Sequence, residues 1–526
     1  MKKLSTLGTI ELNSLFLRAL DLMENSNRNI FITGRAGTGK STLLEYFRAK
    51  TKKKVVVLAP TGVAAVNVAG ETIHSFFRFK PDITMEKIKR KSNKSNSKSI
   101  YHKIDAIIID EISMVRADLL DCVDKFLRLN GKNEKIVFGG IQMIFIGDLY
   151  QLPPVVTPQE QEIFRGYYQS PYFFDAHLFS KLEMDFIELE KIYRQKDQRF
   201  IKLLNAIRNK TITLQDIAKF NEKFDPNFEI KNDDFYITLT TTNQMAKELN
   251  EIELKKIKTK LYQFQGSING KFDLKNLPTD IELQLKVGAQ VMMLNNDKQG
   301  RWVNGTMAKV ADIKQHKQTG EDIIIVEKID GNIVEVTVNT WEIFHYQYNQ
   351  AIGRLETEII GTFTQYPLKL AWAITIHKSQ GKTFDRVIID MGRGAFAHGQ
   401  TYVALSRCRT LSGIILKKPL KLSHVWLDWR IVKFITNFQY QKSQIECSLD
   451  KKIDLIKEAI KNKTKLQITY LKAQDVKSKR VIMPKYVGEM EYLEKTYLGV
   501  EAHCYMRNED RVFRVDRILE IDRVSE

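Results

Sequence analysis

Short apolar runs alternate with amphipathic, helix-like stretches from residue 29 to residue 191. Five runs follow this pattern: NIFITG (29–34), VVVLAP (55–60), AIIIDE (106–111), MIFIGD (143–148) and FIELEK (186–191). Each run is apolar at consecutive positions, which is typical of strands buried on both faces of a parallel sheet. The pattern predicts an α/β domain in this part of the chain.

A second set of apolar runs lies further along the chain: YITLTTTN (236–243), RVIID (386–390) and GIILKK (413–418). Between them, the segment 321–341 consists of two alternating runs around Asp330 and Gly331. Alternation predicts half-buried strands, and an Asp-Gly pair between two such strands predicts a type I′ hairpin. We therefore expect a second α/β domain that is interrupted by a β-rich insert at 263–355.

Polar stretches mark the remaining boundaries. The lysine-rich run TMEKIKRKSNKSNSKSIYHK (84–103) predicts a solvated insert. A helix after Trp429 leads into the polar stretch QKSQIECSLD (441–450), which we interpret as a linker. Residues 451–526 contain one helical segment, IDLIKEAIK, followed by short strand-like runs, and are expected to form a separate small domain.

The charge balance favours a polyanionic partner. The 526 residues include 82 lysines and arginines against 63 aspartates and glutamates, a net charge of +19. A generally basic proteome would give the same balance. The four cysteines contain no C-x-x-C pair, which argues against a zinc ribbon, an iron-sulfur cluster or a disulfide scaffold and fits a reducing cytoplasm; they are Cys122, Cys408, Cys447 and Cys504. No run of about 18 apolar residues occurs, so no membrane span is expected.

The stretch GRAGTGKS (34–41) matches the P-loop pattern G-x-x-x-x-G-K-[ST] in full. It follows an apolar run and opens a helical segment, where backbone N–H groups can hold phosphates. Lys40 would reach the β- and γ-phosphates, and Ser41 would bind Mg²⁺. The residues expected to contact the nucleotide are Gly34, Ala36, Gly37, Thr38, Gly39, Lys40, Ser41 and Thr42. Kinases, GTP switches, transporter subunits and DNA motors share this loop, so it does not decide among them.

Five further residues are candidates for the chemistry at the γ-phosphate. Asp110 and Glu111 end an apolar run, where Asp110 suits the Mg²⁺ shell and Glu111 suits activation of a water. Gln151 in GDLYQLPPV could detect the γ-phosphate. Arg194 in LEKIYRQ and Arg407 in VALSRCRT could stabilise charge on the transferring phosphoryl group. Taken singly, the carboxylates could instead be a helix cap, and an arginine alone is more often a surface ion-pair partner.

Taken together and in order, nine segments resemble the helicases of the Pif (petite integration frequency) family, which are superfamily 1B DNA helicases. The segments are GRAGTGKS, APTGVAAVNVAGETIHSFF, IIIDEISMV, FGGIQMIFIGDLYQLPPV, LEKIYRQ, LKVGAQVMMLNND, VNGTMAKV, AWAITIHKSQGKTFDRVIID and GQTYVALSRCRT. The resemblance covers residues 29 to 430 or so.

The resemblance implies an α/β fold with two RecA-like P-loop domains, 1A and 2A, and ATP with Mg²⁺ in the cleft between them. Domain 1A would span 1–190 with a basic, wedge-like insert at about 78–103. Domain 2A would span 191–262 and 356–440, and the insert at 263–355 would be a small β-barrel called 2B. Arg407 would then be an arginine finger from the opposite domain. Arg194 and the pair Gly381-Lys382 would also face the phosphates.

The resemblance also implies ATP-driven 5′-to-3′ movement on single-stranded DNA with unwinding of tailed or forked duplexes, by a protein that is monomeric in solution. DNA-RNA hybrids and G-quadruplexes are candidate further substrates. The DNA-binding positions would be Thr61, Gly62, His74, Ser75 and Phe76 on 1A, and Thr241, His377, Lys378 and Ser379 on 2A. Core packing is the alternative for Phe76. Family members usually have an adenine-reading glutamine before the first strand; this chain has none there, and Asn13 is the nearest substitute.

The segments LQITYLKA, RVIMPKYVG, KTYLGVEAHC and NEDRVFRVDRI are similar to a WYL domain, another small β-barrel, with Thr496 in place of the name-giving tryptophan. The similarity implies a nucleic-acid or charged-ligand face made of Tyr470, Tyr497, His503, Arg507, Arg511, Phe513 and Arg514. A solvated sheet face would produce the same alternation. A different class of function also stays open: an ATP-dependent DNA clamp in which this domain senses a ligand, without processive unwinding.

Overall fold

The structure is a computed structural model of the chain and describes residues 12–524 with internal gaps. The gaps are 81, 91–99, 157–159, 161–163, 165, 231–233, 273, 275–276, 298, 316–321, 350–353, 393, 396, 473–475 and 493–494. The chain forms two compact units, which are described separately: Met1–Ile207 with Ile212–Trp426, and Arg208–Thr211 with Leu427–Glu526. Residues 91–99 of the lysine-rich run predicted as a solvated insert lie outside the described residues.

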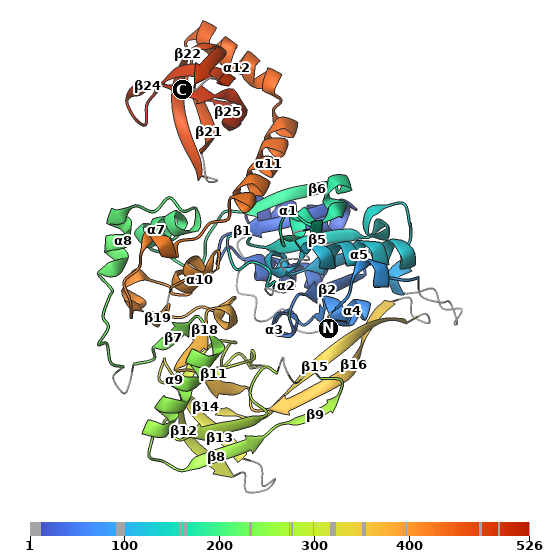
Figure 1. The fold of residues 1–526 in the computed structure, drawn as a ribbon, viewed down its shortest axis with the longest axis vertical. Helices are drawn as coiled ribbons and strands as arrows, with labels where there is room; N and C mark the ends of the chain where they lie inside the picture. The colour runs from blue at the N-terminus through green and yellow to red at the C-terminus, as the bar shows by residue number, and fades with distance from the viewer. Residues whose placement is uncertain are drawn as a thin grey trace. The chain divides into compact units, whose positions relative to one another are not determined.

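The first half of unit 1 is built on a six-stranded parallel sheet with the order β3-β2-β4-β5-β1-β6 (Figure 1). Its strands are β1 (Asn29–Gly34), β2 (Val55–Ala59), β3 (Glu71–Thr72), β4 (Ala106–Ile109), β5 (Gln142–Gly147) and β6 (Met184–Leu189). Helices α1 (Ser14–Asn25) and α2 (Lys40–Lys50) bury their apolar residues against β1 and its neighbours in one core. The five predicted strands are confirmed, and the two-residue strand β3 is the one strand of this sheet that was not predicted.

A second, four-stranded parallel sheet follows with the order β18-β7-β19-β20. Its strands are β7 (Ile237–Thr240), β18 (Ala373–Thr375), β19 (Val387–Asp390) and β20 (Ile414–Leu416). Helices α7 (Gln198–Arg208), α8 (Leu214–Asn221) and α10 (Gln400–Ser406) contribute to its core, and α9 (Asn243–Lys256) follows β7. The predicted second α/β set is therefore confirmed.

An antiparallel insert separates β7 from β18. It contains β8 (Leu261–Gln265), β9 (Ser267–Gly270), β10 (Glu282–Lys286), β11 (Gln290–Met293), β12 (Met307–Gln315), β13 (Asp322–Lys328), β14 (Ile333–Val336), β15 (Asn339–Asn349), β16 (Arg354–Gln365) and β17 (Leu368–Leu370). Because β16 pairs with β15 and β17 pairs with β11, the insert ends near residue 370 and not at 355. The assignment of 356–370 to the second α/β domain was wrong.

The hairpin between β13 and β14 is confirmed, but its turn is not type I′. That turn needs positive φ at both central residues. Only Gly331 (φ 79°) has a positive φ here, while Asp330 does not. The N–H of Gly331 donates to the Lys328 carbonyl (2.9 Å), and the N–H of Lys328 donates to the Asn332 carbonyl (3.0 Å). The loop is therefore one residue longer than predicted, with the glycine at its left-handed position.

Unit 2 consists of two helices and a five-stranded antiparallel sheet of order β24-β23-β22-β21-β25. The elements are α11 (Trp429–Glu446), α12 (Leu449–Asn462), β21 (Leu466–Lys472), β22 (Val476–Tyr492), β23 (Lys495–Cys504), β24 (Glu509–Arg514) and β25 (Ile518–Arg523). Two predictions were wrong. The strands β22 (17 residues) and β23 (10 residues) are longer than predicted. The supposed linker 441–450 is mostly helix, and its Ser443 is buried and donates to the Leu519 carbonyl (2.6 Å).

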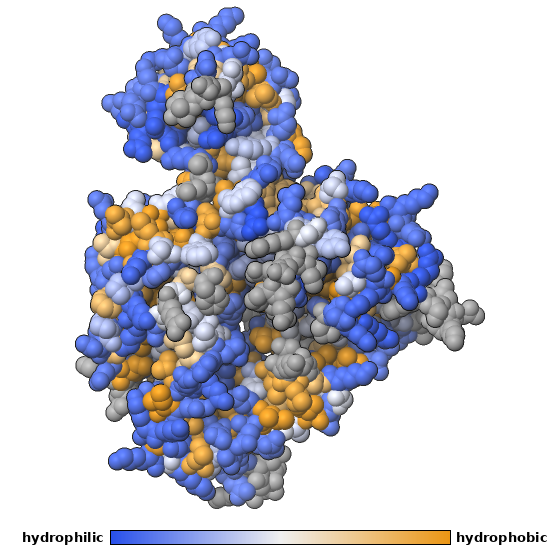
Figure 2. Space-filling model, viewed as in Figure 1, coloured by the Kyte–Doolittle hydropathy of each residue, from blue (hydrophilic) through white to orange (hydrophobic). Residues whose placement is uncertain are grey.

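Hydrophilic side chains dominate the face of the molecule drawn in Figure 2, as the basic composition predicts. No helix among the described residues is long and apolar enough to cross a membrane.

Candidate functional site

The P-loop connects β1, the strand between β5 and β6, to α2. Gly37 (φ 80°) and Gly39 (φ 88°) adopt left-handed conformations. A Cβ on Gly37 would lie 2.5 Å from the Cβ of Arg194, so only glycine allows the loop to adopt this conformation. The Lys40 ammonium donates to the carbonyls of Gly34 (2.7 Å) and Arg35 (3.1 Å). The loop is thus a backbone cradle that opens the helix α2, and its geometry fits a phosphate group.

Two backbone amides of the P-loop donate hydrogen bonds within the protein. The N–H of Ala36 donates to the hydroxyl of Tyr402 (3.1 Å), which comes from α10 under the second sheet. The N–H of Thr38 donates to the Arg35 carbonyl (3.3 Å). Tyr402 is a contact that the sequence analysis missed; it lies two residues before Ala404 in the segment GQTYVALSRCRT.

Two carboxylates stand at the end of β4 beside the P-loop. Burial and the neighbouring Asp110 raise the pKa of Glu111 to about 7, although Lys40 and Arg407 oppose the shift. Burial also raises the pKa of Asp110. Glu111 has a φ of +50°, an unusual backbone state for a residue other than glycine. A carboxyl group with a pKa near 7 is well matched to take a proton from water.

Lys40 is the cation of this group. Burial lowers its pKa, and the carboxylates of Asp148, Glu111 and Asp110 act in the opposite direction. Asp148 follows β5, is fully buried, and accepts from the Gln151 carboxamide (3.2 Å). The sequence analysis did not assign Asp148, although it stands in the segment GDLYQLPPV. Its acidic side chain after an apolar strand is the signal that could have identified it.

A chain of amides joins the two sheets. The Gln380 carboxamide donates to Gln151 (3.1 Å) and to Glu111 (3.3 Å). Gln380 follows β18 in the second sheet, whereas Glu111 and Gln151 belong to the first. Gln380 is a second residue that the sequence analysis missed, in spite of its place in the segment IHKSQGK. These hydrogen bonds connect the carboxylate at the end of β4 to the domain of the second sheet.

Both predicted arginines reach the same cleft. Arg407 is 1% exposed, and it donates to the Val403 carbonyl (2.9 Å) and the Ser406 hydroxyl (3.0 Å). Burial, together with the charge of Arg194, lowers the pKa of Arg407 to about 9. Arg194 donates to the Ser406 carbonyl (3.2 Å). The structure therefore brings two guanidinium groups together at one side of the cleft.

The cleft has a volume of about 1020 Å³. Most of the predicted nucleotide-site residues line it: Ala36, Gly37, Thr38, Gly39, Lys40, Ser41, Thr42, Glu111, Gln151, Arg194, Gly381 and Arg407. This convergence of loops from both sheets, with glycine-only backbone at Gly37, fits a nucleoside triphosphate. Ser41 is exposed at the start of α2. Among the described residues, no group of three or more His, Cys, Asp and Glu side chains could hold a metal without further ligands.

Lys382 does not face the phosphates, so that assignment was wrong. Its ammonium turns toward the insert and donates to the carboxamide oxygen of Asn304 (2.5 Å). Only its neighbour Gly381 lines the cleft. Asn13 plays a structural role, because its side-chain oxygen caps α1 by accepting from the N–H of Phe16 (2.9 Å). Its side-chain amide donates to the Tyr193 hydroxyl (3.3 Å).

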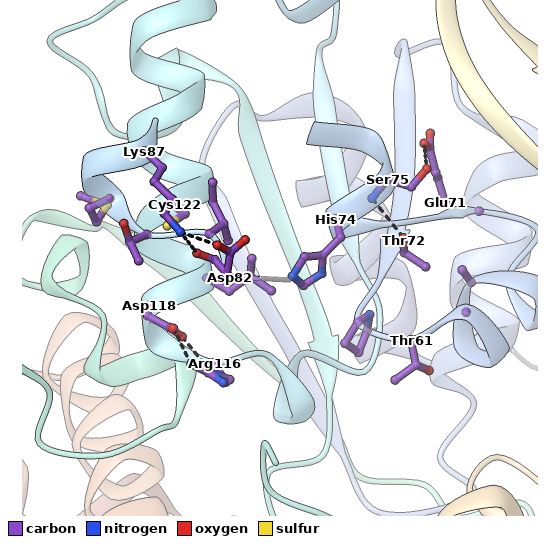
Figure 3. A pocket seen from close by; sticks show the side chains of 18 of the residues that line it. Thr61, Glu71, Thr72, His74, Ser75, Asp82, Lys87, Arg116, Asp118 and Cys122 are labelled. Carbon is purple, nitrogen blue, oxygen red and sulfur yellow. Dashed lines mark hydrogen bonds and ion pairs between the residues drawn. The ribbon is translucent and has the colours of Figure 1, made fainter. Parts of the chain in front are cut away.

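A larger cavity of about 1280 Å³ lies between the first sheet and the strands β15 and β16 of the insert. Four of the predicted DNA-binding residues line it: Thr61, Gly62, His74 and Ser75. In Figure 3 the ring of His74 points into the hollow, with the pairs Lys87–Asp82 and Arg116–Asp118 on one side and Thr61 on the other. Burial lowers the pKa of His74, so its ring is neutral at pH 7. This wall offers hydroxyls, amides and a histidine to a ligand.

The other predicted DNA-binding residues are placed differently. Phe76 is fully buried and its ring packs on Phe77 and Tyr101, so it belongs to the core and offers no face to a base. Ser379 is also fully buried, and its hydroxyl donates to the Ile376 carbonyl (2.7 Å). Both assignments were wrong. Thr241 is 8% exposed, His377 is half-buried and Lys378 is exposed; none of the three lines the large cavity.

The predicted ligand face of unit 2 is present in part. Phe513 is 3% exposed and packs edge-on against Tyr470, so it is core and not surface. Arg514 lies over the ring of Tyr497 (5.4 Å). His503 pairs with Asp510 (3.2 Å), and Arg507 and Arg511 are exposed.

The sequence analysis missed Arg480 on this sheet, which is 4% exposed and stacks over Phe513 (5.6 Å). Lys472 lies close to it. Burial and the charges of Arg480, Arg507 and Arg511 lower the pKa of Lys472. A basic cluster therefore occupies this part of the sheet.

Known proteins are similar to two parts of this chain. A family model described as PIF1-like helicase matches residues 11–217, and one described as WYL domain matches residues 451–523. The ATP-dependent DNA helicase Pif1 of Bdellovibrio bacteriovorus is 34% identical over 418 residues, 77% of this chain and 88% of that protein.

Two solved structures are also similar. Pif1 from Bacteroides sp. in complex with ADP-AlF4 has a TM-score of 0.74 and 35% identity, covering 82% of this chain and 98% of that one. Bacteroides Pif1 bound to ssDNA has a TM-score of 0.58 and 36% identity, covering 81% of this chain and 96% of that one.

Proposed function

The chain belongs to the PIF1-like helicase family, and from that premise we infer that it is an ATP-dependent DNA helicase which moves along single-stranded DNA in the 5′-to-3′ direction. The observation that carries the inference is the cleft itself. Arg407 and Gln380 from the second sheet meet Lys40, Glu111 and Gln151 of the first sheet around one phosphate cradle. A site assembled from two domains couples hydrolysis to the movement of one domain against the other.

Each residue then has a defined role. ATP is the substrate, and the P-loop backbone and Lys40 would hold its phosphates. Ser41 and Asp110 would hold Mg²⁺, which would supply positive charge beside the phosphates. Glu111 accepts the proton of the attacking water. Arg407 and Arg194 stabilise the charge that develops on the transferring group.

Single-stranded DNA, alone or as the tail of a duplex, is the proposed partner, and the large cavity is its proposed path. The hydroxyl of Thr61 and the backbone amide of Gly62 would hold phosphates without reading sequence. Lys378 and His377 would grip the strand from the second domain. DNA-RNA hybrids and G-quadruplexes remain substrates to be tested in the same assay.

A forked duplex tests the activity. We expect strand release on a fork with a 5′ single-stranded tail and none on a duplex with only a 3′ tail, because the tail is the loading track. Strand release is measured by fluorescence with ATP, and hydrolysis is measured in parallel. DNA-stimulated hydrolysis without strand release on any tail would instead identify the DNA clamp. Release on the 3′ tail alone would reverse the polarity.

We further propose that unit 2 is an accessory single-strand contact. Its support is the basic cluster beside Tyr470 and Tyr497, since basic side chains with aromatic faces suit a flexible polyanion. The double variant Arg507→Ala/Arg511→Ala should weaken single-strand binding roughly tenfold and lower the salt dependence. Lys461→Ala, an exposed lysine on α12, is the matched control. Equal anisotropy titrations for all three proteins would exclude this contact.

A further inference from the structure

Three lysines gather where the insert meets the second sheet. Lys378 and Lys382 follow β18, and Lys369 lies on β17. Lys369 is the cross-strand neighbour of Met292, which is also paired with Met307. Both methionines belong to the core under the second sheet, so Lys369 is on the face of the insert that packs on that domain.

Among the described residues, little negative charge compensates Lys369. Burial, followed by the charges of Lys382 and Lys378, lowers the pKa of Lys369 to about 7, and only Asp280 acts in the opposite direction. Burial lowers the pKa of Lys382 to about 8. Like charges at close range in a partly buried site are unfavourable unless an anion joins them.

Asn304 links this group to the first domain. Its oxygen accepts from the Lys382 ammonium (2.5 Å), and its amide donates to the side chain of Asn67 (3.2 Å). Asn67 ends α3 (Gly62–Asn67), whose residues Gly62, Ala65 and Val66 line the large cavity. Through Asn304, Lys382 is therefore connected to a helix that lines the proposed DNA path, and Lys369 and Lys378 are its neighbours.

We propose that Lys369, Lys382 and Lys378 form a phosphate-binding subsite for the backbone of single-stranded nucleic acid, with Asn304 holding Lys382 in position. The proposal rests on the proposed function, because it assumes a strand in the large cavity. A backbone phosphate would bring the missing negative charge to the three ammonium groups.

Strand binding should consequently be linked to protons. At pH 8 a large part of Lys369 and about half of Lys382 are neutral in the free protein. A phosphate beside them raises both pKa values, so binding takes up protons. Affinity should be highest below pH 7 and fall as the pH rises through 7 to 9.

The test combines two measurements on the full chain with an oligothymidylate strand in the absence of ATP. Calorimetry at pH 8 in two buffers of different ionisation enthalpy should show proton uptake for the wild type. Lys369→Met and Lys382→Met should each weaken binding roughly tenfold, abolish part of the uptake and reduce the salt slope by about 0.7. Lys247→Met, an exposed lysine on α9 (78% exposed), should behave as the wild type.

A charge-preserving variant separates binding from folding. Lys369→Arg should keep the salt slope but lose the part of the proton uptake that Lys369 contributes, because arginine stays protonated at pH 8. A wild type that binds with no proton uptake, or methionine variants with an unchanged salt slope, would overturn the subsite and leave the helicase standing. A wild type that binds no strand at all would instead remove the proposed function.

Discussion

Lys40→Ala should abolish ATP hydrolysis and strand release together. The ammonium of Lys40 is the cation that the P-loop holds against Asp110, Glu111 and Asp148, so its removal leaves the phosphates without that charge. Loss of a buried, preorganised charge at the transferring phosphoryl group should cost at least about 10²- to 10³-fold in kcat. Phosphate release on saturating single-stranded DNA measures it, with strand release from the 5′-tailed fork in parallel.

Lys50→Ala is the matched control, because Lys50 is an exposed lysine at the last turn of the same helix and should retain full turnover. Thermal unfolding should show Lys40→Ala folded, since the cradle is built from backbone. If Lys40→Ala still separated strands, ATP hydrolysis at this P-loop would not be the source of energy for unwinding.

The strands of the two parallel sheets could be predicted from sequence because burial on both faces leaves short apolar runs, whose length is typical of strands. The end of the insert could not be predicted from sequence. β16 reads RLETEIIGTFTQ, in which polar residues interrupt the apolar ones, and its membership is decided by pairing with β15, a contact between different parts of the chain. Local pattern carries no information on such pairing.

The candidate site shows the same division. Lys40, Glu111 and Gln151 could be placed because each follows a buried strand, and all parallel strands of a sheet present their carboxyl ends at one edge. The positions of the Phe76 and Lys382 side chains could not be predicted in this way. Their side chains are directed by neighbours that are remote in sequence, the aromatic core around Tyr101 and the Asn304 carboxamide.

Asp148 and Gln380 were missed for a related reason. Each acts through a partner, one holding Gln151 and the other bridging Gln151 to Glu111. A sequence shows that such a residue is present, but the hydrogen bond that gives it a role appears only in three dimensions.

Arg407→Ala should lower DNA-stimulated kcat by about 10³- to 10⁵-fold while ATP still binds. Arg407 comes from the second sheet, is fully buried, and carries a pKa lowered to about 9 by burial and by Arg194. A buried cation with a lowered pKa is stabilised most when negative charge develops beside it. That charge develops while the phosphoryl group is transferred and not in the bound ground state. Single-turnover hydrolysis and binding of a fluorescent ATP analogue separate the two effects.

Arg407→Lys keeps a positive charge but loses the planar fork, so it should recover only part of the rate. Arg386→Ala, which removes an exposed ion pair with Asp234 on the same sheet, should leave turnover intact. Equal losses of binding and turnover in Arg407→Ala would place the arginine in nucleotide binding alone. A selective loss of turnover would mean that Arg407 must approach the phosphates for hydrolysis, and therefore that the two domains must close on each other. A motor that steps along a strand requires such a link between domain closure and hydrolysis.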